Sequence, residues 1–301
     1  MKALVTGATG FVGRALAARL ADPNVLVRDP SRAPRGAAAF AWDAEREVPA
    51  AALDGVDVVF HLAGEPVAEG RWSPAKKARI ESSRVQGTRN VVRAIERAAK
   101  RPSVLVCASA VGFYGSRRDE VLTERSAAGS GFLAEVCAAW EAEARAAESL
   151  GVRVVLARLG IVLGQGGALA AMLPAFRLGL GGPMGDGSQW MPWVHLDDTV
   201  GMLLFAAERD DVRGAMNVCA PEPSRGRDFA RALGRALGRP AFLPVPRIAM
   251  RVVLGETADV VLSSQRAVPE LALRLGYRFQ RPFLDEALAD AVRSQPARAA
   301  G

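Results

Sequence analysis

Lysine is scarce in this chain and accounts for only four of the 39 basic residues. The few lysines are mixed with acidic residues, so no lysine-rich cluster marks a surface for nucleic acid. The net charge is nevertheless +7 because arginine is abundant, as is typical of a GC-rich genome. We therefore expect no nucleic-acid partner, and a modest positive field that favours an anionic cofactor or substrate.

Cysteine is also rare, and long apolar runs are missing. Cys107, Cys137 and Cys219 are widely spaced, odd in number and placed in apolar stretches, which predicts reduced core thiols and excludes a disulfide framework or a metal cluster. No apolar run approaches the ~20 residues of a membrane span, so we expect no membrane partner. The first residues lead directly into a strand and leave no room for a secretion signal. These features predict a cytoplasmic protein without a metal.

Apolar runs alternate with helical patterns over the first half of the chain. Short apolar runs without alternation are typical of strands buried on both faces, and helical spacing between them predicts crossover connections. The expected strands are 2–6, 24–27, 57–63, 103–109 and 152–160, and the expected helices are 11–21, 74–100 and 132–150. This order predicts an α/β fold of the Rossmann type, with a doubly wound parallel sheet and a smaller C-terminal mixed lobe.

The composition changes after Gly160, where glycine and proline become frequent. We predict that residues 1–163 and 189–220 form the nucleotide-binding domain. Residues 164–188 and 221–293 then form a small cap over the substrate, with the glycine-rich segment 179–190 as a mobile lid. The last residues, 294–301, are expected to be a disordered tail.

Three glycines follow the first strand at intervals of three residues. Such a turn lets the backbone approach a pyrophosphate and lets the next helix pack closely on the strand. The free N–H groups at the start of that helix also favour phosphate. The expected cofactor contacts in this turn are Gly7, Thr9, Gly10, Phe11, Val12 and Gly13.

The end of the second strand indicates which dinucleotide is bound. An acidic residue here would hold the ribose diol of NAD, but the sequence continues from Val27 to Arg28, with Ser31 close behind. Because Arg28 can pair with a 2′-phosphate, we predict NADP(H) and expect the neighbouring Asp29 to face solvent. A further strand, the third in chain order, is expected just before Asp43. Asp43 either accepts a hydrogen bond from the adenine amino group or caps a helix.

The fourth strand ends in a turn of small residues, Leu62, Ala63 and Gly64, which we expect to line the adenosine ribose. His61 lies in the apolar part of this strand. A packed core histidine is the favoured interpretation of His61, ahead of a catalytic one.

Longer motifs give a family resemblance. They include T-G-A-T-G-F-V-G at 6–13, H-L-A-G at 61–64 and V-H-L-D-D at 194–198, with strings such as "GFLAEVCAAWE" and "LGLGGPMGDGSQWMPWVH". Together they resemble the extended short-chain dehydrogenase/reductases, which include sugar-nucleotide epimerases and dehydratases. The chain is most similar to the YfcH-like subgroup called epimerase family proteins, from residue 1 to about 293. The stretch from about Pro246 resembles that subgroup's end domain of unassigned function.

The catalytic residues that the resemblance implies are missing. Relatives carry Tyr-x-x-x-Lys at the start of the helix predicted at 132–150, and the phenol moves a proton at the substrate hydroxyl. Here the two possible registers give Leu133 with Cys137, or Phe132 with Val136. The position of the usual Ser or Thr holds Ala110. The prediction of a bound cofactor does not depend on these residues, but the usual catalytic mechanism does and is therefore not expected.

Three residues are the candidates for replacement catalysts, each with a structural alternative. Glu65 is a general base if burial raises its pKa, or else an ordinary loop carboxylate. Tyr114 is a proton donor or an aromatic wall, and Glu135 is an acid on the helix or part of a solvated face. His195 is expected to order the next helix start with Asp198 rather than to titrate in catalysis.

The resemblance also implies further contacts around the cofactor. Arg84 stands where relatives keep an Asn, and we expect it to contact the cofactor. Residues at the strand ends that meet the nicotinamide half in relatives are expected to contact it as well. These further residues are Ala108, Ser109, Arg158, Leu159 and Val162. Trp72, Trp190 and Trp193 are candidate pocket walls.

Two functions remain open at this point. The first is an NADP(H)-dependent oxidoreductase or nucleotide-sugar epimerase-like enzyme with a relocated acid or base, acting on a small-molecule substrate of unknown identity. The second is a catalytically silent NADP(H)-binding sensor that acts through a protein partner. A homodimer is possible in either case.

Overall fold

The fold is built on a seven-stranded sheet in which every strand runs parallel to its neighbours. The structure is a computed structural model and describes residues 1–293, so the predicted tail 294–301 lies outside the described residues. The strands are β1 (Ala3–Thr6), β2 (Asn24–Val27), β3 (Ala38–Ala41), β4 (Val58–His61), β5 (Val104–Ala110), β7 (Arg153–Leu159) and β11 (Gly214–Val218). Their order in the sheet is β11-β7-β5-β4-β1-β2-β3. The predicted α/β Rossmann-type fold class is therefore confirmed.

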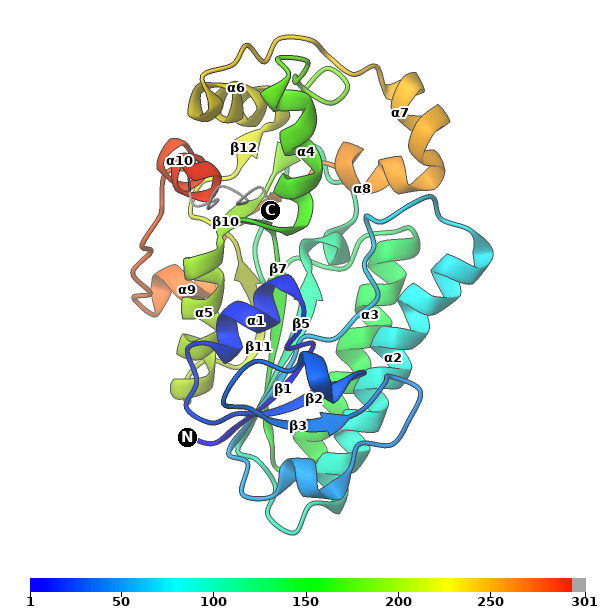
Figure 1. Cartoon of the computed structure of the whole chain (residues 1–301), viewed down its shortest axis with the longest axis vertical. Helices are drawn as coiled ribbons and strands as arrows, with labels where there is room; N and C mark the ends of the chain where they lie inside the picture. The colour runs from blue at the N-terminus through cyan, green and yellow to red at the C-terminus, as the bar shows by residue number, and fades with distance from the viewer. Residues whose placement is uncertain (294–301) are drawn as a thin grey trace.

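Helices cover both faces of this sheet (Figure 1). One face packs α1 (Phe11–Ala17) and α5 (Leu196–Glu208), and the other packs α2 (Pro74–Arg97), α3 (Phe132–Arg145) and the short 3₁₀ segment η4 (Ala146–Leu150). The central strands are buried along their whole length because neither face meets water. This explains why their sequences show apolar runs without alternation.

The remaining elements gather above the carboxyl ends of the strands (Figure 1). Two small sheets pair β8 (Ile161–Leu163) with β10 (Trp193–His195), and β9 (Trp190–Met191) with β12 (Ser224–Arg225). They pack with α4 (Gly167–Arg177), α6 (Gly226–Leu237) and α10 (Leu284–Arg293) around a separate core. Between α6 and α10 the chain forms α7 (Arg247–Leu254), the 3₁₀ turn η5 (Gly255–Thr257) and α8 (Ala258–Leu262).

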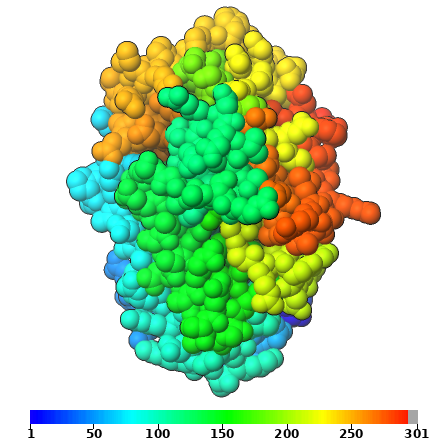
Figure 2. Space-filling view, turned by 180° about the vertical axis from the view of Figure 1, so that it is seen from behind, coloured from blue at the N-terminus to red at the C-terminus, as the bar shows by residue number. Residues whose placement is uncertain are grey.

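The chain then returns to the edge of the main sheet. There β13 (Arg266–Ala267) pairs with β6 (Val121–Leu122), and α9 (Glu270–Arg274) packs against β11. Seen from behind, the last described segment, in orange-red, flanks one side of the molecule, while the α7–α8 segment in lighter orange forms the opposite upper corner (Figure 2). The segment after residue 240 thus reaches across the molecule above the strand ends.

Two sequence predictions, on the state of the cysteines and on membrane crossing, can be compared with this fold. Cys107, Cys137 and Cys219 are all buried and unbridged, as expected for core thiols. Among residues 1–293, no helix combines the length and the apolar character that crossing a membrane requires.

Candidate active site

The glycine turn after β1 has no room for side chains. Gly7 adopts a φ of +70°, and a Cβ built on it would lie 2.9 Å from the backbone N of Ala63. A Cβ on Gly13 would lie 2.1 Å from the Gly7 carbonyl oxygen, which is far inside contact distance. The backbone of the turn therefore lies directly against the β4 turn, and it leaves an open backbone cradle of the kind that a pyrophosphate needs.

A cavity of about 550 Å³ opens beside this turn. It is lined by nine of the residues predicted to contact a cofactor: Gly7, Thr9, Gly10, Val27, Arg28, Asp43, Leu62, Ala63 and Gly64. Ten further residues line it that were not predicted to contact a cofactor, and Arg32, Arg79, Ser82 and Ser83 are among them. We call this space the first cavity. Its backbone cradle, together with arginines at the β2 end, has the chemistry of a dinucleotide site that includes a phosphate on the ribose.

Arg28 and Arg32 are the cations that distinguish this cavity from an NAD site. Both side chains are exposed, and neither forms an ion pair with a carboxylate within the described part of the chain. The neighbouring Asp29 does not line the cavity. Its carboxylate instead accepts hydrogen bonds from the backbone N–H and the hydroxyl of Ser31, at 3.0 and 2.7 Å. Ser31 is therefore engaged with Asp29 and lies outside the cavity lining.

Asp43 closes a turn at the mouth of the first cavity. Its Oδ1 accepts the Glu45 backbone N–H at 3.1 Å, and its Oδ2 pairs with Arg46 at 3.1 Å. No helix follows, so the predicted helix cap is wrong and the side chain caps a turn instead. The carboxylate still faces the cavity, where the predicted contact with an adenine amino group stays a prediction.

A buried chain of hydrogen bonds supports the turn after β4. Thr6 Oγ1 accepts the backbone N–H groups of Leu62 and Ala63, both at 3.0 Å, so its own proton is directed to His61 Nδ1 at 2.8 Å. His61 Nε2 must then carry the proton and donates it to Thr88 Oγ1 at 3.0 Å. Burial lowers the pKa of His61 to about 4. His61 is therefore a neutral core residue, as the sequence favoured.

A second cavity of about 740 Å³ lies next to the first, above the ends of β5 and β7. The residues after β4 connect the two, because Leu62 to Pro66 line the first cavity and Val67 and Ala68 line the second. The start of α3, the loop before β9, and α7 to α8 form the other walls. Of the predicted lid, Met184 and Trp190 line this second cavity.

The vacant catalytic positions are part of this second cavity. Phe132 and Leu133 line it from the first turn of α3, and Ala110 lines it from the end of β5. Val136 and Cys137 are buried behind them. Desolvation raises the pKa of the Cys137 thiol to about 11, so a thiolate does not replace the missing groups.

An ammonium group reaches the cavity from a different element. Lys77, in the first turn of α2, lines the second cavity and places its Nζ 5.2 Å from the ring centre of Phe132 and 6.0 Å from that of Trp72. It also forms an ion pair with Glu256 of η5. Sequence reasoning missed Lys77 because it searched for the cation on α3, whereas only the fold brings α2 to the same cavity.

Tyr114 does not line either of these cavities, which corrects its proposed role as a proton donor. The side chain is fully buried, and its hydroxyl accepts a hydrogen bond from Arg158 at 2.9 Å and donates one to Asn217 Oδ1 at 2.7 Å. Desolvation raises the pKa of Tyr114 to about 12. The hydroxyl is committed to a structural network.

The same network accounts for two residues that were predicted to contact the cofactor. Arg158 is buried and makes two hydrogen bonds to Glu141, at 2.8 and 2.9 Å, and Ser109 donates to Glu141 at 2.7 Å. The Arg158 guanidinium also lies 3.6 Å above the ring centre of Phe113. Both side chains hold α3 against the sheet, and neither lines a cavity.

The two candidate carboxylates are also placed differently from expectation. Glu65 lines the first cavity and pairs with Lys76 at 2.8 Å, and this hydrogen bond lowers its pKa, whereas a general base needed a raised one. Glu135 is exposed on α3 and does not line either cavity. The structure therefore supports the alternatives for both: a paired loop carboxylate and a solvated helix face.

Other predicted cofactor residues support the site from behind. Arg84 donates to the carbonyl oxygens of Glu65 and Ile80, at 3.0 and 3.1 Å, and its guanidinium fills the space beside Gly64. Phe11 packs against Gly164 and Gly166. Of the remaining predicted residues, Leu159 lines the second cavity, while Val12, Gly13, Ala108 and Val162 line neither.

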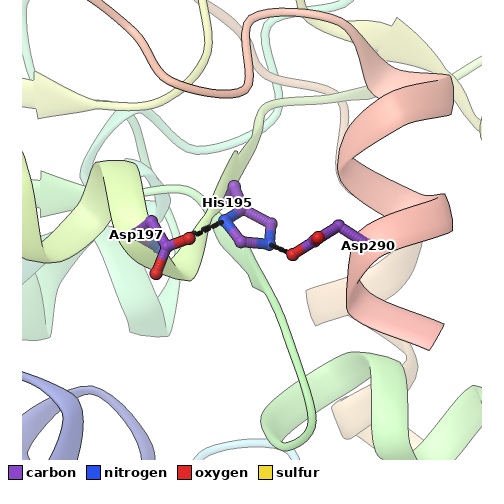
Figure 3. A group of neighbouring side chains, drawn as sticks. All are labelled: His195, Asp197 and Asp290. Carbon is purple, nitrogen blue, oxygen red and sulfur yellow. Dashed lines mark hydrogen bonds and ion pairs between the residues drawn. The ribbon is translucent and has the colours of Figure 1, made fainter. Parts of the chain in front are cut away.

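His195 orders the start of α5, but with Asp197 rather than with Asp198. Its Nδ1 accepts the Asp197 backbone N–H at 3.2 Å, so Nε2 carries the proton toward Asp290 Oδ2 at 3.2 Å. Figure 3 shows the ring between the two carboxylates, with Asp290 reaching it from α10. Ligand atoms of the three groups lie within 4.8 Å of one another, but both ring nitrogens are already engaged, Nδ1 by the Asp197 N–H and Nε2 by Asp290, and we assign no metal to them. Asp198 instead binds the backbone N–H groups of Gln280 and Arg281.

Comparison with protein families agrees with this geometry. Residues 3–219 match the NAD dependent epimerase/dehydratase family, and residues 245–291 match a domain of unknown function, DUF1731. The second match confirms that the stretch from about Pro246 resembles an end domain of unassigned function. An Arabidopsis thaliana protein named epimerase family protein SDR39U1 homolog, chloroplastic, is 42% identical over 299 residues, covering 96% of this chain and 86% of its own.

Solved structures give the same result. The crystal structure of human epimerase family protein SDR39U1 (isoform2) with NADPH has a TM-score of 0.88 at 34% identity, and the match covers 98% of this chain and 100% of that chain. A nucleoside-diphosphate sugar epimerase from Corynebacterium glutamicum gives a TM-score of 0.78 at 33% identity, over 97% of this chain and 58% of its own. The overall fold is thus shared with these relatives over almost the whole of this chain.

Proposed function

Since the chain belongs to the NAD-dependent epimerase/dehydratase family, we propose that it is an NADPH-dependent oxidoreductase acting on a small carbonyl compound. The observation that carries the proposal is that the two cavities adjoin, since successive residues of the segment 62–68 line first one and then the other. A glycine cradle and two unpaired arginines stand at one end, and a cavity large enough for a small substrate stands at the other. The NADPH in the crystal structure of the human relative supports the choice of cofactor.

The residues of the first cavity hold the cofactor in this proposal. The backbone of Gly7 and Gly10 would face the pyrophosphate, and Arg28 and Arg32 would pair with the 2′-phosphate. When bound, NADPH would supply the hydride that the carbonyl carbon of the substrate accepts. Lys77 gives the proton that the resulting alkoxide oxygen needs, and it regains a proton from solvent. Phe132 and Trp72 shape the site around this ammonium and exclude water from one side.

The cofactor assignment predicts a selective effect of Arg28→Ala. An arginine–phosphate contact contributes roughly 1.5–3 kcal/mol, so NADPH binding should weaken on the order of 10- to 100-fold while NADH binding barely changes. Titration of tryptophan fluorescence with each nucleotide measures both constants, and Arg35→Ala, outside the cavity lining on the same loop, is the matched control. Equal losses for both nucleotides would contradict the 2′-phosphate contact.

The proton-donor assignment predicts a loss of turnover without a loss of cofactor. With a carbonyl substrate found by screening NADPH oxidation, Lys77→Met should lower kcat by about 10²-fold or more, the typical contribution of a general acid. Lys77→Arg keeps the charge and the pair with Glu256, but it should restore little activity because arginine does not release its proton. Unchanged NADPH titrations show that the variants remain folded. Full activity in Lys77→Met would contradict the assignment.

A second function is favoured by one specific observation. The strand-end side of the second cavity carries only apolar side chains, where a catalyst is usual. A silent NADP(H)-binding sensor would bind NADPH with the same Arg28 dependence, yet it would oxidise none of a panel of aldehydes, ketones and nucleotide sugars. The NADPH-oxidation screen therefore separates the two functions.

A further inference from the structure

The second cavity is apolar at the strand ends and charged where the C-terminal segment closes it. Ala110, Val111, Leu133 and Leu159 line the strand-end side, and none of these side chains offers a hydrogen-bonding group. The charged side chains come from the start of α2 and from the segment 247–259. In Figure 1, α7 lies beyond α8 from the ends of β5 and β7. A ligand that fills the cavity meets an apolar wall at one end and ions at the other.

Most of these ions already have partners. Lys77 pairs with Glu256, and Arg251 lies 3.4 Å from Asp259. Arg247 is different, because no carboxylate lies within ion-pair distance of it in the part of the chain that the structure describes. Three cations therefore face two carboxylates, and the excess is one positive charge.

The stem of Arg247 is held at the cavity wall. Gly185 has a φ of +63°, and a Cβ there would lie 3.0 Å from Arg247 Cγ, so the arginine stem packs on this glycine. The acid that senses the charge of Arg247 is Asp186. Its pKa is lowered mainly by hydrogen bonds from Ser188 and to a smaller degree by Arg247. Its carboxylate accepts the Ser188 N–H and hydroxyl at 3.0 and 2.7 Å, and Asp186 does not line the cavity. The guanidinium of Arg247 thus remains available to a ligand.

We propose that the substrate is an amphipathic monoanion: an apolar body with its reactive carbonyl at the strand ends and a carboxylate, at the far end, paired with Arg247. This inference rests on the proposed oxidoreductase function. A carboxylate matches one excess positive charge, whereas a phosphate monoester carries about −1.5 to −2. The planar guanidinium also offers two parallel donors that suit a carboxylate.

The same lining disfavours a nucleotide sugar. A base, a ribose, a pyrophosphate and a hexose need many donors and acceptors, because buried polar groups without partners are costly. Apart from the ions, the polar side chains of the lining are three serines and Gln265, and Ser116 Oγ already accepts the Ser264 N–H at 3.2 Å. Trp72 and Trp190 have committed their indole N–H groups to Val67 and Asp119, so they present only ring surface.

The test measures ligand binding to protein saturated with NADP⁺, so that no turnover occurs during the titration. Calorimetry compares 7-oxooctanoate, which carries a ketone and a carboxylate at opposite ends, with 2-octanone and UDP-glucose. We expect 7-oxooctanoate to bind on the order of tenfold more tightly than 2-octanone. Arg247→Gln should remove this tenfold advantage and leave 2-octanone unchanged. The control Arg278→Gln, an exposed arginine outside both cavities, should behave as wild type.

Each other outcome overturns the inference. Tighter binding of UDP-glucose than of 7-oxooctanoate would overturn the substrate class. It would also be overturned if neither 7-oxooctanoate nor 2-octanone bound. Loss of the advantage in Arg251→Gln but not in Arg247→Gln would overturn the assignment of the anion site. Failure of NADP⁺ itself to bind is a different result, because it would refute the proposed function rather than the substrate class alone.

Discussion

At the scale of single residues, the first cavity depends on side chains that a ligand would never touch. Thr6 and His61 fix the turn at Leu62 and Ala63 through hydrogen bonds. Because Thr6 Oγ1 already accepts two backbone N–H groups, its own proton must point to His61 Nδ1. A charged His61 would carry a proton on Nδ1 and point it at a hydroxyl whose lone pairs already accept two N–H groups. The neutral form of His61 is therefore part of the fold of the cavity.

This arrangement predicts that the protein becomes less stable in acid because His61 takes up a proton on unfolding. The pKa of about 4 in the folded protein lies below the usual 6.5, so the unfolded chain binds the proton more readily. The free energy of unfolding should fall as the pH drops below 6.5 and level off near 4, by roughly 3 kcal/mol in total. Urea unfolding across this range compares wild type with His61→Asn, which lacks this component of the slope. Thr88→Ser keeps the histidine and the hydroxyl, and should retain the wild-type slope; equal slopes in all three proteins would rule the mechanism out.

The residue scale is also where the sequence was least informative. The place of Arg28 in the lining of the first cavity could be predicted because Arg28 lies one step after a strand, which is local information. Lys77 could not be, because a cation in the first turn of a charged helix looks the same whether it faces a cavity or water. Tyr114 and Arg158 were misjudged for a related reason. The partners that occupy them, Asn217 and Glu141, lie 103 and 17 residues away, and no sequence pattern announces those bonds.

At the scale of elements, the alternation of strands and helices was predictable because burial on both faces leaves a clear pattern. All five predicted strands belong to the main sheet. Helix ends were less predictable. The first helix ends at Ala17 rather than at residue 21, and Asp22 takes a φ of 44° before β2. The helix predicted to reach residue 150 tightens into a 3₁₀ segment after Arg145 and stops at Gly151, which has the left-handed conformation expected of a C-terminal glycine.

Element packing also explains why the missing Tyr and Lys leave no hole. Phe132 and Leu133 replace a polar pair with apolar surface, and the ring of Phe132 meets Trp72 edge to face with ring centres 5.1 Å apart. The first turn of α3 is thus packed against the loop before α2. In the proposed function, the proton donor therefore lies on α2 rather than on α3.

At the scale of the whole molecule, the second cavity exists because distant segments of the chain meet over it. Trp72 and Thr257 are 185 residues apart, yet the Trp72 backbone N–H donates to Thr257 Oγ1 at 3.1 Å. The Thr257 hydroxyl donates in turn to the Gly70 carbonyl at 3.1 Å. A contact of this range leaves no periodicity in the sequence. Two predicted pocket walls, Trp72 and Trp190, do line the second cavity, but the junction at Thr257 could not be located from the sequence.

This junction predicts a local change when the hydroxyl of Thr257 is removed. Thr257→Val keeps the shape of the buried side chain but leaves two backbone groups without their partner, at about 1–3 kcal/mol for each group that stays buried. Because the junction joins the loop at 70–77 only to the segment 247–262, the loss should appear as opening of these two segments rather than as global unfolding. Hydrogen exchange should accelerate there by tenfold or more, while β1 and β5 keep their protection. Thr257→Ser, which retains the hydroxyl, should exchange as wild type does. An acceleration spread evenly over the sheet would instead mean that the segment folds as one unit with the nucleotide-binding domain, and that the second cavity does not open independently.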